Sequence, residues 1–407
     1  MGRQRQLPAR SVRPTVATVA TVGLRERLAC NPKSQLPVQT PTILDMTKHP
    51  DVTIIGGGII GLTCAYFLAK EGLCVELFDR GEPGQEASWA GAGIIPPGNP
   101  AGAATPLDRL RAIGSVRFPN LASELRELTH LDNGYRRCGG IEFFDQNPEP
   151  ILELWQQEGI RFEPLNREQL RRLEPAVEGV PGQPYLLPDC AQVRNPWHLR
   201  ALIAACEQVG VILHRNTPLT AAEVVNARRC LIAAGAWSDA VLGATVSRLQ
   251  VYPVRGQIVL LKPRVPLISR VLMVGKRYLV PRADGQVLIG STEEPEAGFE
   301  KANTAQAVSD LISFACGLVP ALATAELVKC WSGLRPGTAD GLPYIGRVPE
   351  RENLFIATGH FRAGVQLSLG TAQAITELLT GRPTCVSLAA FAVGRPPARV
   401  SRNAFRS

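Results

Sequence analysis

A glycine-rich turn between an apolar strand and a helix restricts the fold of this sequence more than any other feature. Residues 51–55 read Asp-Val-Thr-Ile-Ile, a β-branched run typical of a buried parallel strand. Residues 59–70 predict a helix that ends before Glu71-Gly72, and residues 73–79 predict a second strand. The three segments predict one βαβ unit of about 30 residues.

The turn itself reads Gly-Gly-Gly-Ile-Ile-Gly over residues 56–61 and matches the pattern G-x-G-x-x-G. A strand before it and a helix after it are the context that a dinucleotide pyrophosphate requires. Gly56 allows the tight turn, Gly58 admits the pyrophosphate, and Gly61 lets the helix lie on the strand. Ile59 and Ile60 open the helix, whose first N–H groups face the phosphates.

Asp79 ends the second strand, 18 residues after Gly61. A carboxylate at this position accepts a hydrogen bond from a ribose 2′-hydroxyl. Arg80 beside it could serve a 2′-phosphate, but the acid at position 79 favours an adenosine without one. The motif alone does not distinguish NAD from FAD.

The net charge of +8 lies at the two ends of the chain. Residues 1–45 hold seven Lys or Arg against two acids, and residues 394–407 hold four Arg and no acid, so residues 46–393 carry −1. A nucleic-acid-binding protein places its basic excess on a folded face. No apolar stretch reaches the roughly 20 residues that span a bilayer. We therefore expect neither nucleic acid nor a membrane as partner.

Residues 1–45 are rich in Arg and poor in acids, as transit peptides are. Met46 stands directly before the first strand, so an upstream start codon explains the segment equally well. We expect a disordered basic extension here, a basic tail over 394–407, and a cytoplasmic protein, with organellar import if the extension is a transit peptide. Ten scattered cysteines without any C-x-x-C predict reduced thiols and no metal site.

Between residues 252 and 292, short apolar segments and an Asp284-Gly285 turn predict antiparallel strands. Asn195-Pro196 predicts an N-cap for a helix over 197–209. Further elements are predicted as strands at 141–145, 211–215, 230–237 and 353–360, and as helices at 121–128, 151–157, 168–173, 304–318 and 366–379. The pattern indicates an α/β fold with two interleaved domains, the second of α+β type.

Four later segments carry a resemblance to a known family. Residues 84–95 read GQEASWAGAGII, residues 233–238 AAGAWS, residues 333–346 GLRPGTADGLPYIG, and residues 357–372 ATGHFRAGVQLSLGTA. In this order they resemble the D-amino acid oxidase family of FAD-dependent oxidoreductases, most closely its glycine oxidase branch, which serves thiamine biosynthesis. The resemblance runs from about residue 50 to residue 393.

The resemblance implies a Rossmann-like FAD-binding domain made of residues 46–135, 190–250 and 326–393. Residues 136–189 and 251–325 are then the substrate domain, with an antiparallel or mixed sheet. The family also implies self-association into a homo-oligomer.

The same resemblance implies FAD as a non-covalent cofactor, because residues 334–336 read Leu-Arg-Pro where covalent relatives have cysteine. The small residues of 87–94 let backbone approach a flat isoalloxazine edge, and the helix after His360 directs its N-terminus at the ring. The expected FAD-contacting residues are Gly56, Gly58, Ile59, Ile60, Gly61, Asp79, Arg80, Ala87, Ser88, Ala92, Gly93, Ile94, Leu219, His360, Phe361, Arg362, Ala363, Gly364, Val365 and Gln366.

On the substrate side, the family pattern assigns the amino-acid carboxylate to Arg335 and places Arg362 and Tyr278 in the same pocket. An arginine can hold a carboxylate by two parallel hydrogen bonds and so orient the Cα atom. No catalytic acid or base is expected, because hydride leaves Cα directly for flavin N5. His360 is expected to contact FAD through its backbone.

The function expected from this resemblance is oxidation of glycine or another small amino acid to its imine. O2 accepts the electrons and gives hydrogen peroxide, and the imine yields glyoxylate and ammonia or enters thiazole formation. Three alternatives stay open: a D-amino acid dehydrogenase that reduces a quinone, a non-catalytic FAD-binding protein, and an NAD-dependent dehydrogenase.

Overall fold

The computed structural model describes residues 50–396 except residue 145 and residues 244–248. The predicted N-terminal extension and all but the first three residues of the predicted C-terminal tail lie outside these ranges. The described residues all belong to one of the chain's two compact units, and the arrangement below is that of this unit alone.

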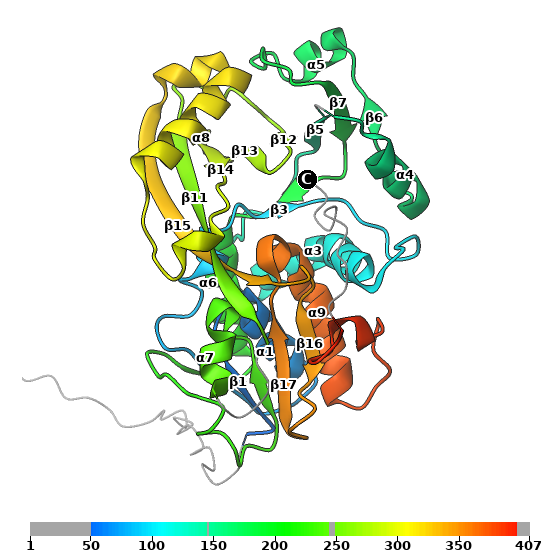
Figure 1. Ribbon diagram of the computed structural model, residues 1–407, viewed down its shortest axis with the longest axis vertical. Helices are drawn as coiled ribbons and strands as arrows, with labels where there is room; N and C mark the ends of the chain where they lie inside the picture. The colour runs from blue at the N-terminus through cyan, green and yellow to red at the C-terminus, as the bar shows by residue number, and fades with distance from the viewer. Residues whose placement is uncertain (1–49, 145, 244–248, 397–407) are drawn as a thin grey trace, which may run out of the picture. The chain divides into compact units, whose positions relative to one another are not determined.

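The predicted βαβ unit forms the centre of a six-stranded sheet (Figure 1). Strand β1 runs parallel to β2, and Ile54 lies opposite Leu77. Every pair in this sheet is parallel except β16–β17. In spatial order the strands are β16 (Tyr344–Arg347), β17 (Leu354–Thr358), β10 (Cys230–Ile232), β1 (Val52–Ile55), β2 (Val75–Phe78) and β9 (Ile212–His214).

Residues of β1, β10 and β17 are all buried, as expected for parallel strands covered on both faces. On one face, α1 (Ile59–Lys70) and α3 (Pro106–Thr129) each contact both α6 (Asn195–Gln208) and α9 (Gly364–Leu379). On the other face lies a second cluster that includes Leu242 of α7 (Ser238–Leu242). Among the described helices, none combines the length and the apolar character that a membrane crossing needs.

A second sheet of eight strands carries the other half of the site. Its longest strands, β11 and β15, are antiparallel, with Val254 opposite Arg335 and Ile258 opposite Trp331. In order the strands are β15 (Glu326–Thr338), β11 (Val251–Lys262), β14 (Val287–Gly290), β13 (Arg277–Pro281), β12 (Val271–Val274), β5 (Gly140–Phe144), β7 (Gln183–Leu187) and β6 (Glu163–Pro164).

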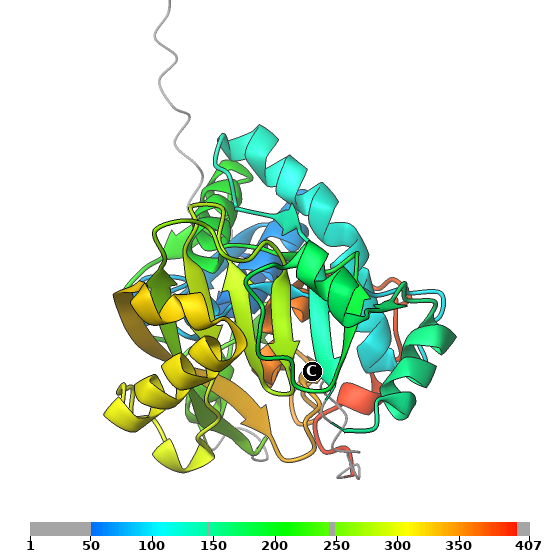
Figure 2. The ribbon, with the colours of Figure 1, turned by 90° about the horizontal axis from the view of Figure 1, so that it is seen from above.

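Helix α8 (Ala305–Leu318) covers one face of this sheet, where Leu311 and Ala315 join Val259 and Ile289 in one apolar cluster. Seen from above, α8 in yellow and the long α3 in cyan lie to different sides of the strands (Figure 2). The remaining elements are short: α2 (Ala87–Ala90), α4 (Glu149–Glu158), α5 (Arg167–Leu173), a small sheet of β3 (Ile94–Ile95), β8 (Ala191–Gln192) and β4 (Arg136–Arg137), and 3₁₀ turns at Gly235–Trp237, Pro295–Ala297, Pro320–Thr324, Phe361–Ala363 and Ala389–Phe391.

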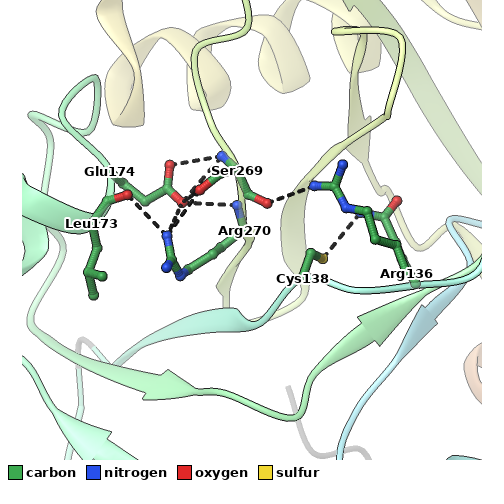
Figure 3. A network of polar contacts seen from close by, with 7 residues as sticks. Arg136, Cys138, Leu173, Glu174, Ser269 and Arg270 are labelled. Carbon is green, nitrogen blue, oxygen red and sulfur yellow. Dashed lines mark hydrogen bonds and ion pairs between the residues drawn. The ribbon is translucent and has the colours of Figure 1, made fainter.

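Glu174, which ends α5, joins this helix to the start of β12 (Figure 3). Its carboxylate is 1% exposed and accepts hydrogen bonds from the Ser269 N–H at 3.0 Å and the Ser269 hydroxyl at 2.6 Å. The Arg270 N–H donates at 2.9 Å, and the Arg270 guanidinium lies at 3.2 Å. A buried carboxylate is tolerated here because four donors satisfy it.

The structure confirms the predicted α/β class, with a Rossmann-like parallel sheet and a second, mostly antiparallel sheet. The helix predicted at 121–128 is only the end of α3, which begins at Pro106 and continues through Pro119. The N-cap predicted for Asn195 is wrong: Arg194 occupies that position, and the Asn195 amide donates to the Ser88 carbonyl at 2.7 Å. The predicted domain boundaries stay a prediction, although β15 pairs along β11.

Replacing Glu174 by Ala should lower the free energy of unfolding by about 2–4 kcal/mol, because four donors lose a buried charged acceptor. Thermal unfolding followed by circular dichroism measures this loss. The matched control is Glu168→Ala on the same helix, where an exposed ion pair with Arg172 is removed and little change is expected. Equal unfolding temperatures for the two variants would contradict the role given to Glu174.

Candidate cofactor and substrate cavities

Two neighbouring cavities contain the residues that the sequence singled out. The larger, about 360 Å³, is here called the glycine-loop cavity because Gly56 and Gly58 line it. The other, about 150 Å³, is called the tyrosine cavity because Tyr278 lines it. Their shared lining residues are Ala87, Gly91, Arg335, Arg362 and Val365.

The glycine-loop cavity lies at the carboxyl ends of the parallel strands. Gly56 follows β1, Asp79 follows β2, Ala233 follows β10, and His360 lies two residues beyond β17, and all four line it. Open parallel sheets bind their ligands at this edge. The order of the strands therefore places the predicted nucleotide-binding residues in one cavity.

Two of the three motif glycines are required by their surroundings. Gly56 has φ +111°, and a Cβ atom there would overlap the Ala233 carbonyl. A Cβ at Gly61 would overlap the Gly56 carbonyl, so this residue sets the contact of α1 with the turn. Gly58 precedes α1, has no side-chain cap and lines the cavity. A helix that begins in this way offers its N-terminus to an anion.

Asp79 holds the glycine turn with both carboxylate oxygens. One accepts the Gly57 N–H at 2.7 Å, and the other accepts the Gly81 N–H at 2.8 Å. Burial raises the pKa of Asp79, and these two hydrogen bonds act in the opposite direction. A carboxylate offers about four acceptor sites, so capacity for a ribose hydroxyl remains.

Arg80 stacks on an aromatic ring at the same end of the cavity. Its guanidinium lies 3.7 Å from the centroid of the Trp237 ring and forms an ion pair with Glu86 at 2.9 Å. Glu86 also pairs with Lys301 at 2.8 Å, so its carboxylate is shared between two cations. Leu219 lines this end as well. Trp237 belongs to the AAGAWS segment but is not among the site residues expected from the sequence.

The loop over residues 87–94 is fixed by side chains from other elements. Arg282, at the end of β13, donates to the Ala92 carbonyl at 2.8 Å and to the Gln192 side chain at 2.9 Å. Burial lowers the pKa of Arg282 to about 10, which leaves it protonated at neutral pH. The Trp331 indole donates to the Ala90 carbonyl at 3.0 Å. The loop thus has a defined shape before any ligand binds.

Asn195 contributes an unsatisfied polar atom to the glycine-loop cavity. It is 2% exposed, and its amide nitrogen binds the Ser88 carbonyl. Its Oδ1 atom has no hydrogen-bond partner among the described residues. The Ser88 hydroxyl accepts the Ile59 N–H at 2.9 Å, so Ser88 joins this loop to α1. An orphaned buried acceptor in a cavity fits a ligand that donates a hydrogen bond there.

The segment before α9 closes the other end of the cavity. His360 is buried, and its Nε2 atom lies 3.0 Å from the Thr371 hydroxyl. Burial lowers the pKa of His360 to about 3, so the ring is neutral at physiological pH. Gln366 lines the tyrosine cavity but directs its amide to the Ser115 hydroxyl at 2.8 Å. It joins α9 to α3.

Arg335 faces both cavities from β15. Its guanidinium donates to the Thr292 carbonyl at 3.1 Å and to the Ser291 hydroxyl at 2.7 Å, both neutral acceptors. It lies over Gly256, where any Cβ atom would overlap it. Within the described ranges no carboxylate lies at ion-pair distance from it. Burial, followed by the charge of Arg362, lowers the pKa of Arg335.

Arg362 differs from Arg335 because it has its own carboxylate. Glu293 lies 3.0 Å from it, and the Lys276 carbonyl accepts a hydrogen bond from it at 2.7 Å. Lys276 also pairs with Glu293 at 2.9 Å. Arg362 therefore has a carboxylate at ion-pair distance, whereas Arg335 has none within the described residues and feels only the more distant charge of Glu293.

Tyr278 completes the tyrosine cavity. Its ring covers Gly290 on the neighbouring strand, where a Cβ atom would come within 2.6 Å of it. The Tyr278 hydroxyl also acts on Arg335, since a side-chain hydrogen bond between them opposes the fall in the pKa of that guanidinium. Arg335 and Tyr278 thus come together at one wall of the cavity.

Every residue proposed from the sequence lines one of the two cavities, except Gly61, which lies beneath the turn. Their roles stay predictions, while their common location is a property of the structure. Sequence reasoning missed Asn195, Trp237, Met273 and Arg282. Trp237 lies in a segment quoted for the family resemblance and could have been selected from it, whereas the other three lie outside those segments.

Comparison with known proteins gives a consistent answer. Residues 51–378 match the family described as DAO, FAD dependent oxidoreductase. A glycine oxidase of Pseudomonas aeruginosa is 34% identical over 84% of this chain and 98% of that protein. A bifunctional ThiO/ThiG protein of Trichormus variabilis is 30% identical over 85% of this chain and 55% of that protein.

A glycine oxidase of Geobacillus kaustophilus is 35% identical over 86% of this chain and 98% of that protein. The crystal structure of glycine oxidase from the same organism covers 86% of this chain and 100% of that chain, with a TM-score of 0.78 and 33% identity.

The described residues fit FAD. The glycine turn leaves room for a pyrophosphate against the start of α1, and Asn195, whose Oδ1 atom is unsatisfied, is among the residues that line the same cavity. The cavity continues to Arg335 and Arg362, where it meets the tyrosine cavity. One elongated cofactor can therefore extend from the glycine turn to the arginines.

The depressed pKa of His360 predicts a pH-dependent loss of stability. An unfolded histidine takes up its proton near pH 6.5, whereas folded His360 does so only near pH 3. Its contribution to stability is therefore complete above pH 6.5 and is lost as pH falls toward 3. Relative to His360→Gln, the wild type should lose about 1.4 kcal/mol per pH unit within this window.

Urea unfolding at pH 7, 6, 5 and 4 measures this difference. The control is His130→Asn at the exposed end of α3, which should follow the wild type at each pH. Parallel stability curves for the wild type and His360→Gln would show that His360 is not buried as a neutral ring.

Proposed function

We propose that this chain, which belongs to the DAO family of FAD-dependent oxidoreductases, oxidises glycine or another small amino acid to its imine. It is an FAD-dependent amino acid oxidase by its family and its similarity to glycine oxidases.

The observation that supports this substrate class most directly is the charge on Arg335. A partly buried guanidinium without a carboxylate partner is costly, because the neutral Ser291 and Thr292 oxygens balance no charge. A substrate carboxylate would supply the missing charge through two parallel hydrogen bonds. The cavity of about 150 Å³ beside it suits a small amino acid.

Bound FAD supplies the two-electron chemistry, accepting a hydride and passing electrons to O2 to give hydrogen peroxide. The protein's part is orientation. Arg335 and Tyr278 fix the carboxylate at one wall of the tyrosine cavity and thereby fix the Cα–H bond. Arg362, held by Glu293, supports the same wall.

His360 stays neutral at physiological pH and makes its hydrogen bond to Thr371, so the proposal gives it no proton to transfer. The substrate must then enter with its amine unprotonated. With glycine, the imine hydrolyses to glyoxylate and ammonia. The similarity to ThiO/ThiG supports use of the imine for thiazole formation in thiamine biosynthesis.

Anaerobic mixing of the flavin-loaded protein with glycine, sarcosine and D-alanine tests the proposal. At least one of the three should bleach the flavin, and air should restore the colour with release of hydrogen peroxide. A flavin that keeps its colour with all three would overturn the proposed substrate class. Bleaching without reoxidation by air would instead support a quinone as acceptor.

Arg335→Lys should lower kcat/KM for glycine at least about 100-fold, because lysine keeps the charge but loses the two-hydrogen-bond geometry. FAD content should remain that of the wild type, since the glycine turn is untouched. Arg347→Lys, on the exposed side of β16, is the matched control and should keep full activity. If kcat/KM for glycine is unchanged in Arg335→Lys, Arg335 does not bind the substrate carboxylate.

A further inference from the structure

A third, much smaller pocket adjoins the tyrosine cavity. Its volume is about 20 Å³, and it shares Pro96, Pro97 and Met273 with the larger cavity. Its other walls include Glu142 and two aromatic side chains. A space of this size holds one group comparable to a water molecule. Met273, an unbranched side chain that readily changes its conformation, lines both spaces.

The two spaces are joined by a single row of residues across the eight-stranded sheet. Tyr278 lies opposite Met273, and Met273 lies opposite Glu142. Residues paired in this way point to the same face of a sheet, and neighbouring strands are about 4.8 Å apart. Glu142 is therefore about 10 Å along the sheet from the residue that stands beside Arg335.

Glu142 is a buried carboxyl group for which neither the hydrogen bonds nor the ion pairs of the described residues provide a partner. It is 4% exposed. Burial raises the pKa of Glu142 to about 8. The titratable groups next to it are the Cys190 thiol, whose pKa burial also raises, and Tyr185 across β7. Within the described chain, no cation balances Glu142 when it ionises.

The aromatic walls of the small pocket suit a positive group. Phe144 and Trp155 line it and contact each other edge to face, with ring centroids 5.8 Å apart. Tyr185 and Phe162 extend this aromatic cluster. Aromatic ring faces attract cations, and more strongly where water is excluded. The water-sized space between a carboxyl group and aromatic rings matches the size of an ammonium group, and a cation bound there would favour the ionised form of Glu142.

We propose that Glu142 is a specificity-determining residue whose small pocket receives the terminal ammonium group of a substrate held by its carboxylate at Arg335. This inference rests on the proposed function and extends its substrate class to amino acids with a linear cationic side chain of about lysine's length. Glycine leaves the small pocket unused and remains a substrate. The added selectivity comes from charge at the far end of the cavity.

Binding of linear carboxylates that lack an α-amino group tests this assignment without any oxidation step. Isothermal titration calorimetry on the flavin-loaded full chain would use acetate, hexanoate, 6-hydroxyhexanoate and 6-aminohexanoate. The wild type should bind 6-aminohexanoate at least tenfold more tightly than either of the other six-carbon acids. In Glu142→Gln this preference should vanish, whereas acetate affinity should stay within twofold.

Glu163→Gln, on the exposed β6 strand of the same sheet, is the matched control and should keep the preference. Glu142→Asp, which retains the charge, should recover part of it. Equal binding of the six-carbon acids by the wild type, or a preference that survives in Glu142→Gln, would overturn the proposal. So would loss of acetate binding in both Glu142 variants, because Glu142 would then be a structural residue.

A kinetic comparison separates this inference from the proposed function. Lysine of each configuration and glycine are compared as substrates in the wild type and in Glu142→Gln. For the configuration that is oxidised, KM should rise at least tenfold in the variant with kcat little changed, and glycine kinetics should be unaffected. If the wild type does not oxidise glycine, the proposed function is wrong. If glycine is oxidised but the KM for lysine is the same in the wild type and in Glu142→Gln, only the role of Glu142 is wrong.

Discussion

The charge of Arg335, which no carboxylate of the described residues pairs with, is the constraint from which the rest of the site follows. Its place over Gly256 requires a glycine on β11, because a Cβ atom there would overlap the guanidinium. Its neighbour Arg362 already has Glu293 as a partner, so the two arginines are not equivalent. A protein can keep such an unbalanced cation when its ligand brings the opposite charge, which is the basis of the carboxylate site proposed here.

The two cavities depend on each other through the loop over residues 87–94. In the sequence this loop comes soon after β2 of the parallel sheet. Its carbonyl groups nevertheless accept hydrogen bonds from Arg282 and Trp331, which belong to the eight-stranded sheet or directly follow one of its strands. Asn195 holds it from α6. A change in the packing of either sheet would therefore shift the backbone at which the cofactor and substrate spaces meet. The orientation that the proposed reaction needs depends on these few long-range hydrogen bonds.

The sequence predicted the fold best where the structure depends on residues that are close together in the chain. The βαβ unit was predicted closely because glycine spacing and β-branched residues act over a few positions, and α1 occupies residues 59–70 as predicted. The N-cap prediction for Asn195 was wrong because an asparagine side chain can cap a helix or bind a distant backbone group equally well. Here it donates a hydrogen bond to the Ser88 carbonyl. Met273 and Glu142 escaped selection because their place in one row with Tyr278 depends on strand register, which local patterns do not reveal.

The pairing of β15 with β11 limits how the site can change by insertion or deletion. A bulge between Leu260 and Leu261 shows that the distant end of this pair accommodates an extra residue. Near Val254 the pairing is regular, so one residue added there would turn the guanidinium to the opposite face of the sheet. Among homologues, insertions and deletions in β15 should therefore occur around residues 326–329, whereas the end of the strand near residue 335 should keep a fixed length.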